Sequence, residues 1–143
     1  MKLKIKYLEN FVGKEINKKK EDSGYDLYAS IKEEIVLKPM QIETISLGFS
    51  LEIVDGDTFE IQIRGRSGLN SRGIIATFGT IDNGYRGEFK TTIINLSGED
   101  FIIKPGDRIC QMVIAKTEHL EIEEVDQLSE SERLARGFGS SGI

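Results

Sequence analysis

Two aspartates are the leading candidates for chemistry in this chain of 143 residues. The sequence holds one histidine, His119, and one cysteine, Cys110, so it can build neither a Cys/His zinc site nor a catalytic triad. A hydrolase made from these residues must activate water with a carboxylate, a metal ion or both. Asp26 and Asp82 each lie in a glycine-containing cluster, where a carboxylate is exposed and positioned. Both also fit the role of a turn-forming aspartate.

A short basic segment offers groups that bind phosphate. Arg66, Ser67 and Gly68 supply a guanidinium fork, a hydroxyl and an unhindered backbone amide within three residues. The segment is not a Walker A loop, because no Gly-Lys-Ser/Thr follows a four-residue spacer. These residue types are also ordinary in turns, so the spacing indicates a possible anion site and leaves a turn open.

Charge and hydropathy exclude two classes of partner. A formal net charge of −5 and a pI of about 5.0 make the chain a poor candidate for sequence-independent binding of nucleic acid. The longest nearly apolar stretch, residues 74–78, is far too short to span a bilayer. The N-terminus alternates lysines with apolar residues and does not resemble a signal peptide. We therefore expect a cytoplasmic protein with no nucleic-acid or membrane partner.

Short alternating runs of apolar and polar residues dominate the chain and predict β-strands. Glycines separate the runs, as is typical of turns between strands. Many short strands predict an all-β sandwich or barrel with one core, which suits a chain of this length. The alternating runs are residues 2–7, 42–47, 59–64, 89–93 and 109–113.

Three local features refine this expectation. Pro105-Gly106-Asp107 predicts a turn, and in the strand after it Ile109, Gln111 and Val113 are expected to share one face. A helical interpretation is attractive only over residues 67–72 and 129–135.

The C-terminal part of the chain changes in composition. Residues 117–132 contain seven acidic residues and no Lys or Arg, which favours a solvated strand and linker over an acidic interaction tail. Residues 134–143 combine glycines and serines with an isolated Phe138. Such a tail alone is usually disordered, but an aromatic ring, an arginine and two hydroxyls on flexible backbone also suit a loop that wraps a nucleotide.

Five polar clusters follow one another between the predicted strands, and together they resemble the five motifs of the trimeric dUTP diphosphatase (dUTPase) family. The resemblance covers roughly residues 3–143, and five motifs in register are a specific signal. The clusters are 23–27 (SGYDL), 65–69 (GRSGL), 79–87 (GTIDNGYRG), 106–111 (GDRICQ) and 137–142 (GFGSSG).

The resemblance implies a fold, an assembly and a reaction. The subunit would be an antiparallel, jelly-roll-like β-clip domain over residues 1–128, with a flexible C-terminal arm over 129–143. Three such subunits would form a homotrimer, and each arm would close an active site of a neighbouring subunit. The enzyme would use Mg²⁺ to hydrolyse dUTP to dUMP and pyrophosphate, which limits uracil in DNA and supplies dUMP for dTMP synthesis.

The resemblance also implies roles for individual residues. Asp82 would orient and deprotonate the water that attacks the α-phosphorus, and Tyr85 would pack under the deoxyribose and exclude a 2′-hydroxyl. Residues 79–85 would read uracil through main-chain groups, and Asp26 would help to place Mg²⁺ through its bound waters. The full set of implied substrate-binding residues is Arg66, Ser67, Gly68, Gly79, Thr80, Ile81, Tyr85, Lys90, Gln111, Arg133, Phe138, Gly139, Ser140 and Ser141.

The sequence departs from the family pattern in three places. Gly65 stands where proline is common, and the stretch 73–79 is about two residues shorter than usual, with Ala76 near the position of a base-contacting asparagine. An arginine normally stands five residues before the phenylalanine of the last motif, which selects Arg133. Leu134 and Arg136 occupy positions where glycines are usual.

Two alternatives remain. A dCTP deaminase of the same superfamily shares the Arg-Ser pair and a segment like 82–87, but its deaminating glutamate would fall at Thr92, which cannot shuttle protons. A non-catalytic β-domain that acts as an interaction module is the other, although the joint presence of the motif residues argues against it.

Overall fold

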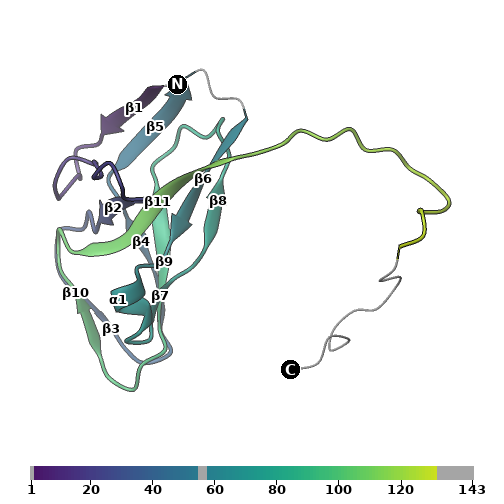
Figure 1. Ribbon diagram of the computed structural model, residues 1–143. Coiled ribbons are helices and arrows are strands. Elements are labelled where there is room, and N and C mark those ends of the chain that lie inside the picture. Colours follow the sequence, from purple (N-terminus) through teal and green to yellow (C-terminus); the bar gives the residue numbers. More distant parts are fainter. Residues whose placement is uncertain (1, 55–57, 132–143) are drawn as a thin grey trace.

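The folded part of the chain consists of short antiparallel strands and a single short helix in a computed structural model, which describes residues 2–54 and 58–131 (Figure 1). The all-β prediction is confirmed. The elements are β1 (Lys2–Tyr7), β2 (Tyr25–Tyr28), β3 (Ile35–Leu37), β4 (Ile42–Ser46), β5 (Phe49–Val54), β6 (Phe59–Arg64), α1 (Ser67–Asn70), β7 (Ile74–Ala76), β8 (Gly79–Ile81), β9 (Lys90–Asn95), β10 (Phe101–Ile103) and β11 (Arg108–Lys116).

Four small sheets make up the domain. A four-stranded sheet has the order β2-β11-β6-β8, and a three-stranded sheet has the order β4-β9-β7. Two further pairs, β1 with β5 and β3 with β10, complete the fold. Every strand pairing within the described residues is antiparallel. Four of the five motif clusters, 23–27, 65–69, 79–87 and 106–111, lie on or directly beside strands of the four-stranded sheet.

Alternation along each strand produces the core. In β5 every second side chain is buried, beginning with Phe49, whose ring stacks on Phe89 at 5.0 Å between centroids. Ile61 in β6 and Ile93 in β9 are fully buried from the other sheets. Each such side chain contributes roughly 1.5–3 kcal/mol of transfer free energy, so the sheets are held together by their inward faces.

The face predicted for the last strand is wrong. Cys110 and Met112 point into the core, whereas Gln111 and Val113 are only half-buried. The reason is a β-bulge, a register shift between residues 108 and 110 where β11 pairs with β2, and it leaves Ile109 buried as well.

The other local predictions hold in part. The helical turn expected over 67–72 is present as α1, and the turn at Pro105-Gly106-Asp107 joins β10 to β11, with Gly106 at φ +80°. Residues 129–131 are not helical, and the rest of the second predicted helix lies outside the described residues.

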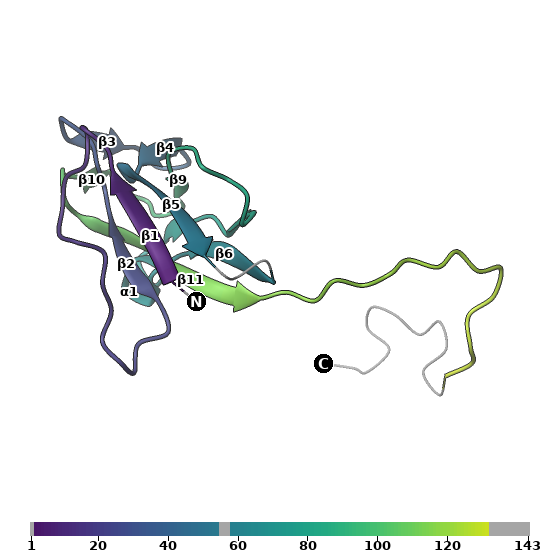
Figure 2. The ribbon, with the colours of Figure 1, turned by 90° about the horizontal axis from the view of Figure 1, so that it is seen from above.

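Residues 117–131 leave the sheets after β11 and form no strand, so the predicted solvated strand is absent there (Figures 1 and 2). Their apolar side chains are exposed, including Leu120 at 79% and Ile122 at 94%. The division into a domain over 1–128 and an arm over 129–143 stays a prediction. Within the described residues no helix is long and apolar enough to cross a membrane.

Candidate active site

A hollow of about 520 Å³ lies at one end of the four-stranded sheet. In this sheet β11 lies between β2 and β6, with Gln111 opposite Asp26 on one side and opposite Arg64 on the other. The loop that follows β6 therefore starts beside the aspartate and the glutamine. Three of the five motif clusters, 23–27, 65–69 and 106–111, meet at this hollow because of that register.

Asp26 holds two arginines in this hollow. Its Oδ1 lies 3.2 Å from Nε of Arg66, and its Oδ2 accepts a hydrogen bond of 3.0 Å from Nη1 of Arg108. The Asp26 side chain is 37% exposed, and an ion pair in contact with water contributes little stability. An incoming anion with several oxygens can therefore take over both guanidinium groups at small cost.

Hydrogen bonds to the main chain hold the segment 65–68. Nε2 of Gln111 donates to the Gly65 carbonyl at 2.9 Å, and Nη1 of Arg66 donates to the Arg108 carbonyl at 3.1 Å. Gly68 has open space where a Cβ would be. The segment 65–68 is therefore anchored at its start and accessible at its end.

A second hollow, of about 330 Å³, is lined by Thr80, Ile81, Asp82, Tyr85, Glu88, Phe89 and Lys90. The Tyr85 ring packs at a tilt against Phe89, at 5.9 Å between centroids, and its Oη donates to the Glu88 carbonyl at 3.1 Å. A Cβ at Gly87 would lie 2.3 Å from that hydroxyl, so any other residue there would displace the ring. The tyrosine is thus fixed at the wall of this hollow and is 45% exposed.

Glu88, which lines this second hollow, is hydrogen-bonded to Asn10 near the N-terminus. Its carboxylate accepts hydrogen bonds from Nδ2 of Asn10, at 2.8 Å, and from Oγ of Ser46. The bond from Asn10, followed by that from Ser46, lowers the pKa of Glu88 despite its partial burial. The carboxylate also lies 3.8 Å from Nζ of Lys90.

The two hollows occupy opposite ends of β6. Gly79 pairs with Ile63 and Ile81 pairs with Ile61, so the chain beyond β8 runs toward the start of β6. Arg66 follows the end of that strand. Six residues of extended strand span about 20 Å, which is far outside the hydrogen-bonding reach of a general base. One chain therefore does not bring Asp82 to its own segment 65–68.

Cys110 takes no part in the chemistry. It lies on β11 of this sheet and is fully buried, and burial raises the pKa of its thiol to about 12. The side chain of Thr91 and the charge of Arg66 act in the opposite direction without overcoming that burial. A protonated, inaccessible thiol is no nucleophile, as expected from the absence of a partner histidine.

The family model for dUTPase matches residues 15–142, which include every lining residue of both hollows. The chain belongs to the dUTPase family. It is 44% identical over 149 residues to the deoxyuridine 5′-triphosphate nucleotidohydrolase of Orientia tsutsugamushi (strain Ikeda), covering 100% of this chain and 99% of the relative. The enzyme of the same name from Finegoldia magna is 46% identical over 123 residues, covering 84% of this chain and 85% of that one.

A solved structure has the same fold as this dUTPase-family chain. The dUTPase of Staphylococcus bacteriophage 80alpha, as a G164S mutant with dUpNHpp, aligns with a TM-score of 0.88 at 26% identity. The alignment covers 99% of each chain. The jelly-roll-like dUTPase fold implied by the motifs is thereby confirmed.

The structure divides the predicted site residues of this dUTPase-family chain into three groups. The first hollow contains Asp26, Arg66, Ser67, Gly68 and Gln111, and the second contains Thr80, Ile81, Asp82, Tyr85 and Lys90. Gly79 begins β8 next to the second hollow. The remaining five, Arg133, Phe138, Gly139, Ser140 and Ser141, lie outside the described residues.

Sequence reasoning missed several residues that line the hollows. Arg108 lies within the cluster 106–111, but the sequence indicates no role for it, because its partner Asp26 is 82 positions away. Lys18 and Lys19 also line the first hollow, and a lysine run carries no signal that separates it from a solvated loop. Glu88 was missed for the same reason as Arg108, since Asn10 is 78 positions away.

Proposed function

We propose that this chain hydrolyses dUTP to dUMP and pyrophosphate in the cytoplasm, limiting uracil in DNA and supplying dUMP. The observation that carries the proposal is that the family match, residues 15–142, includes the whole lining of both hollows. Relatives that are 46% and 44% identical to this chain bear the name of this activity.

The first hollow would bind the triphosphate. Its lining includes four basic side chains, Lys18, Lys19, Arg66 and Arg108, against two carboxylates. Phosphate oxygens would take over the two guanidinium groups that Asp26 now holds, and the hydroxyl and amide of 67–68 would add neutral donors.

The first hollow also suits Mg²⁺ bound with its substrate. No group of three metal-ligating side chains exists within the described residues, so the protein alone does not form a complete cage. Mg²⁺ is commonly held by one or two carboxylates, water and substrate phosphates, and Asp26 fits that donor set. The ion would neutralise phosphate charge, and Asp26 would hold it through bound water once the arginines turn to the phosphates.

The second hollow would bind the nucleoside and supply the base. Asp82 would accept a proton from the water that attacks the α-phosphorus in line with the pyrophosphate leaving group. β8 is an edge strand of its sheet, so Gly79, Thr80 and Ile81 have main-chain groups on the side away from β6 to read the edge of uracil. Backbone groups fixed in this way distinguish uracil from cytosine, whose hydrogen-bonding edge is inverted.

Tyr85 would select the deoxyribose, and Tyr85→Ala tests this role. The substitution should reduce the preference for dUTP over UTP, because the ring occupies the space that a 2′-hydroxyl needs. A pocket that rejects an added hydroxyl by shape supplies roughly 10²-fold discrimination, so the ratio of kcat/KM values should fall by up to that factor. Tyr85→Phe, which keeps the ring, is the matched control and should retain the preference. Unchanged rejection of UTP by Tyr85→Ala would refute this role.

The two hollows would be joined by assembly into a homotrimer. They lie about 20 Å apart on β6, so a complete site needs the first hollow of one copy and the second hollow of another. The outer face of the β4-β9-β7 sheet offers an apolar surface for such contact, with Ile42 60% exposed and paired in register with Ile94. The C-terminal arm, with Arg133 and Phe138, would close a site of a neighbouring copy.

Assembly is tested by sedimentation equilibrium. We expect a mass near three times 16.0 kDa, with no change across the concentrations used for the assay. A stable monomer that hydrolyses dUTP at full rate would contradict the shared site.

Pyrophosphate release from dUTP tests the activity itself. The purified protein with Mg²⁺ should release pyrophosphate from dUTP and leave dCTP and UTP nearly untouched. Release of ammonia from dCTP would instead indicate the deaminase alternative, and inertness toward all three nucleotides would indicate a non-catalytic domain.

A further inference from the structure

The turn that carries Asp82 and Tyr85 has no strand to hold it. It lies between β8, which ends at Ile81, and β9, which begins at Lys90, and its one internal main-chain bond runs from the Tyr85 amide to the Asp82 carbonyl at 3.0 Å. The Asp82 carboxylate forms no hydrogen bond or ion pair within the described part of the chain. The position of this carboxylate is therefore set by the backbone of the turn.

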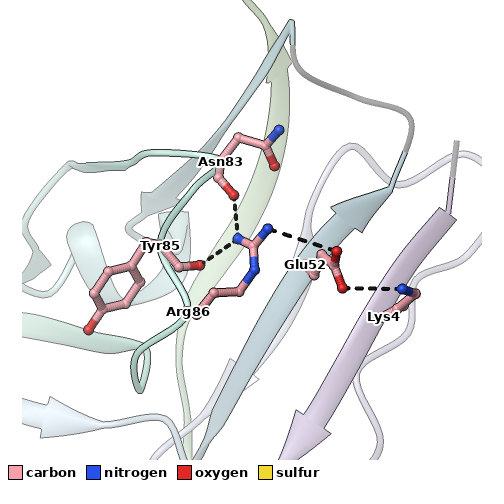
Figure 3. Close-up of polar contacts among 5 residues, drawn as sticks. All are labelled: Lys4, Glu52, Asn83, Tyr85 and Arg86. Atoms are coloured by element: carbon pink, nitrogen blue, oxygen red, sulfur yellow. Dashed lines mark hydrogen bonds and ion pairs between the residues drawn. The ribbon is translucent and has the colours of Figure 1, made fainter.

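The Arg86 side chain bridges two main-chain carbonyls of that turn (Figure 3). Its Nη1 donates to two main-chain carbonyls, those of Asn83 at 2.5 Å and Tyr85 at 3.0 Å. A hydrogen bond from a charged donor to a carbonyl is stronger than a hydrogen bond from a neutral backbone amide. Because the two carbonyls lie on either side of Gly84, one guanidinium group fixes the path of the backbone across a glycine, the residue type with the least restricted backbone.

The same guanidinium reaches the neighbouring sheet more weakly. Its Nη2 lies 4.0 Å from Oε1 of Glu52 on β5, and Oε2 of Glu52 lies 3.2 Å from Nζ of Lys4 on β1 (Figure 3). All three side chains are at least two-fifths exposed, and ion pairs of this kind contribute little. The hydrogen bonds to the two carbonyls therefore account for most of the effect of Arg86 on the turn, and its ion pair with Glu52 adds little.

We propose that Arg86 is a positioning residue for hydrolysis, which holds Asp82 and Tyr85 in place by bridging the carbonyls of Asn83 and Tyr85. This inference rests on the proposed function, because it assumes that Asp82 and Tyr85 meet the substrate. Arg86 itself lies outside the lining of both hollows and needs no contact with the nucleotide.

Arg86→Ala should lower kcat for dUTP by about 10- to 10²-fold, because a displacement of about 1 Å at the base has an effect of that size. KM for dUTP should change by less than about threefold, since the phosphate-binding hollow is at the other end of β6 and supplies most of the charge. The preference for dUTP over UTP should fall with kcat, because Tyr85 shares the turn. A general loss of stability would not produce this combination.

Two matched variants separate the effect of the hydrogen bonds to the carbonyls from the effect of the ion pair with Glu52. Glu52→Gln removes the ion pair and leaves the hydrogen bonds from Arg86 to the two carbonyls, so its kcat should stay within about twofold of the wild type. Arg86→Lys keeps the charge and offers an ammonium to the carbonyls, so its kcat should lie between those of Arg86→Ala and the wild type. In Arg86→Ala, guanidinium chloride at tens of millimolar should restore part of kcat and have no such effect on Tyr85→Ala.

Amide hydrogen exchange of residues 82–88 without nucleotide provides a readout that does not depend on activity. Arg86→Ala should exchange faster than the wild type over these residues alone, with an unchanged thermal melt. If the wild type does not hydrolyse dUTP, the proposed function fails while this exchange result still tests the clamp. Wild-type exchange and wild-type kcat in Arg86→Ala would overturn the proposal, as would a Glu52→Gln variant that is equally impaired. If Arg86→Ala does not fold, Arg86→Lys with wild-type exchange but a kcat reduced tenfold would overturn it.

Discussion

Asp82→Asn is expected to lower kcat for dUTP by about 10²- to 10⁴-fold while nucleotide binding persists. The amide is close in shape to the carboxylate but cannot accept the proton of the attacking water. The Asp82 side chain makes no hydrogen bond or ion pair within the described residues, so the substitution breaks no side-chain contact that the fold needs. The first hollow, which would hold the triphosphate, lies at the other end of β6 and is left as it is.

Single-turnover hydrolysis and equilibrium binding of dUTP measure the two effects separately. Asp82→Ala is a useful companion, because it should be equally slow if the carboxylate acts as a base. Near-wild-type turnover by Asp82→Asn would make Asp82 a turn residue and would place water activation elsewhere.

Arg133→Ala should slow turnover strongly, whereas Arg136→Ala should have a mild effect. Both residues lie outside the described residues, so this prediction comes from sequence alone. Arg133 stands five residues before Phe138, the family spacing, which would let its guanidinium reach the terminal phosphates as the ring covers uracil. Arginines that neutralise charge in a closed phosphoryl-transfer site contribute about 10³- to 10⁵-fold, and a partly exposed arm should contribute less.

Steady-state dUTP hydrolysis and thermal melts of the two variants test this assignment. Removal of all residues after Ala135 should also abolish most activity without unfolding the domain, because Met112 is the last buried apolar residue among those described. If Arg136→Ala is the crippling change and Arg133→Ala the mild one, the register of the last motif is wrong.

The sequence predicted the strands better than it predicted the contacts between them. Alternation in 2–7 and 59–64 identified β1 and β6 because one side of each strand is more buried than the other. The same reasoning failed in β11, because a bulge inserts one residue and leaves no trace in the polarity pattern.

For the candidate site, too, the residues could be predicted from the sequence but their contacts could not. The motif clusters indicated which residues line the hollows, because glycines and charged groups gather where chains turn. They did not indicate that Arg66 and Arg108 share Asp26, or that Glu88 is held by Asn10, since these partners are far apart in the sequence and meet only in the folded chain. The departure of the stretch 73–79 from the family pattern did not prevent β8 from pairing with β6.

The placement of the two hollows at opposite ends of β6 has a genetic consequence. Suppose that each working site combines hollows from two copies. A subunit without Arg66 still has an intact second hollow with Asp82, and a subunit without Asp82 still has an intact first hollow, so together they form a complete site. Two alleles that are each inactive would then complement one another in a mixed assembly. An allele that carries both defects in the same subunit would not be active. A cell carrying both alleles would retain part of its capacity to clear dUTP.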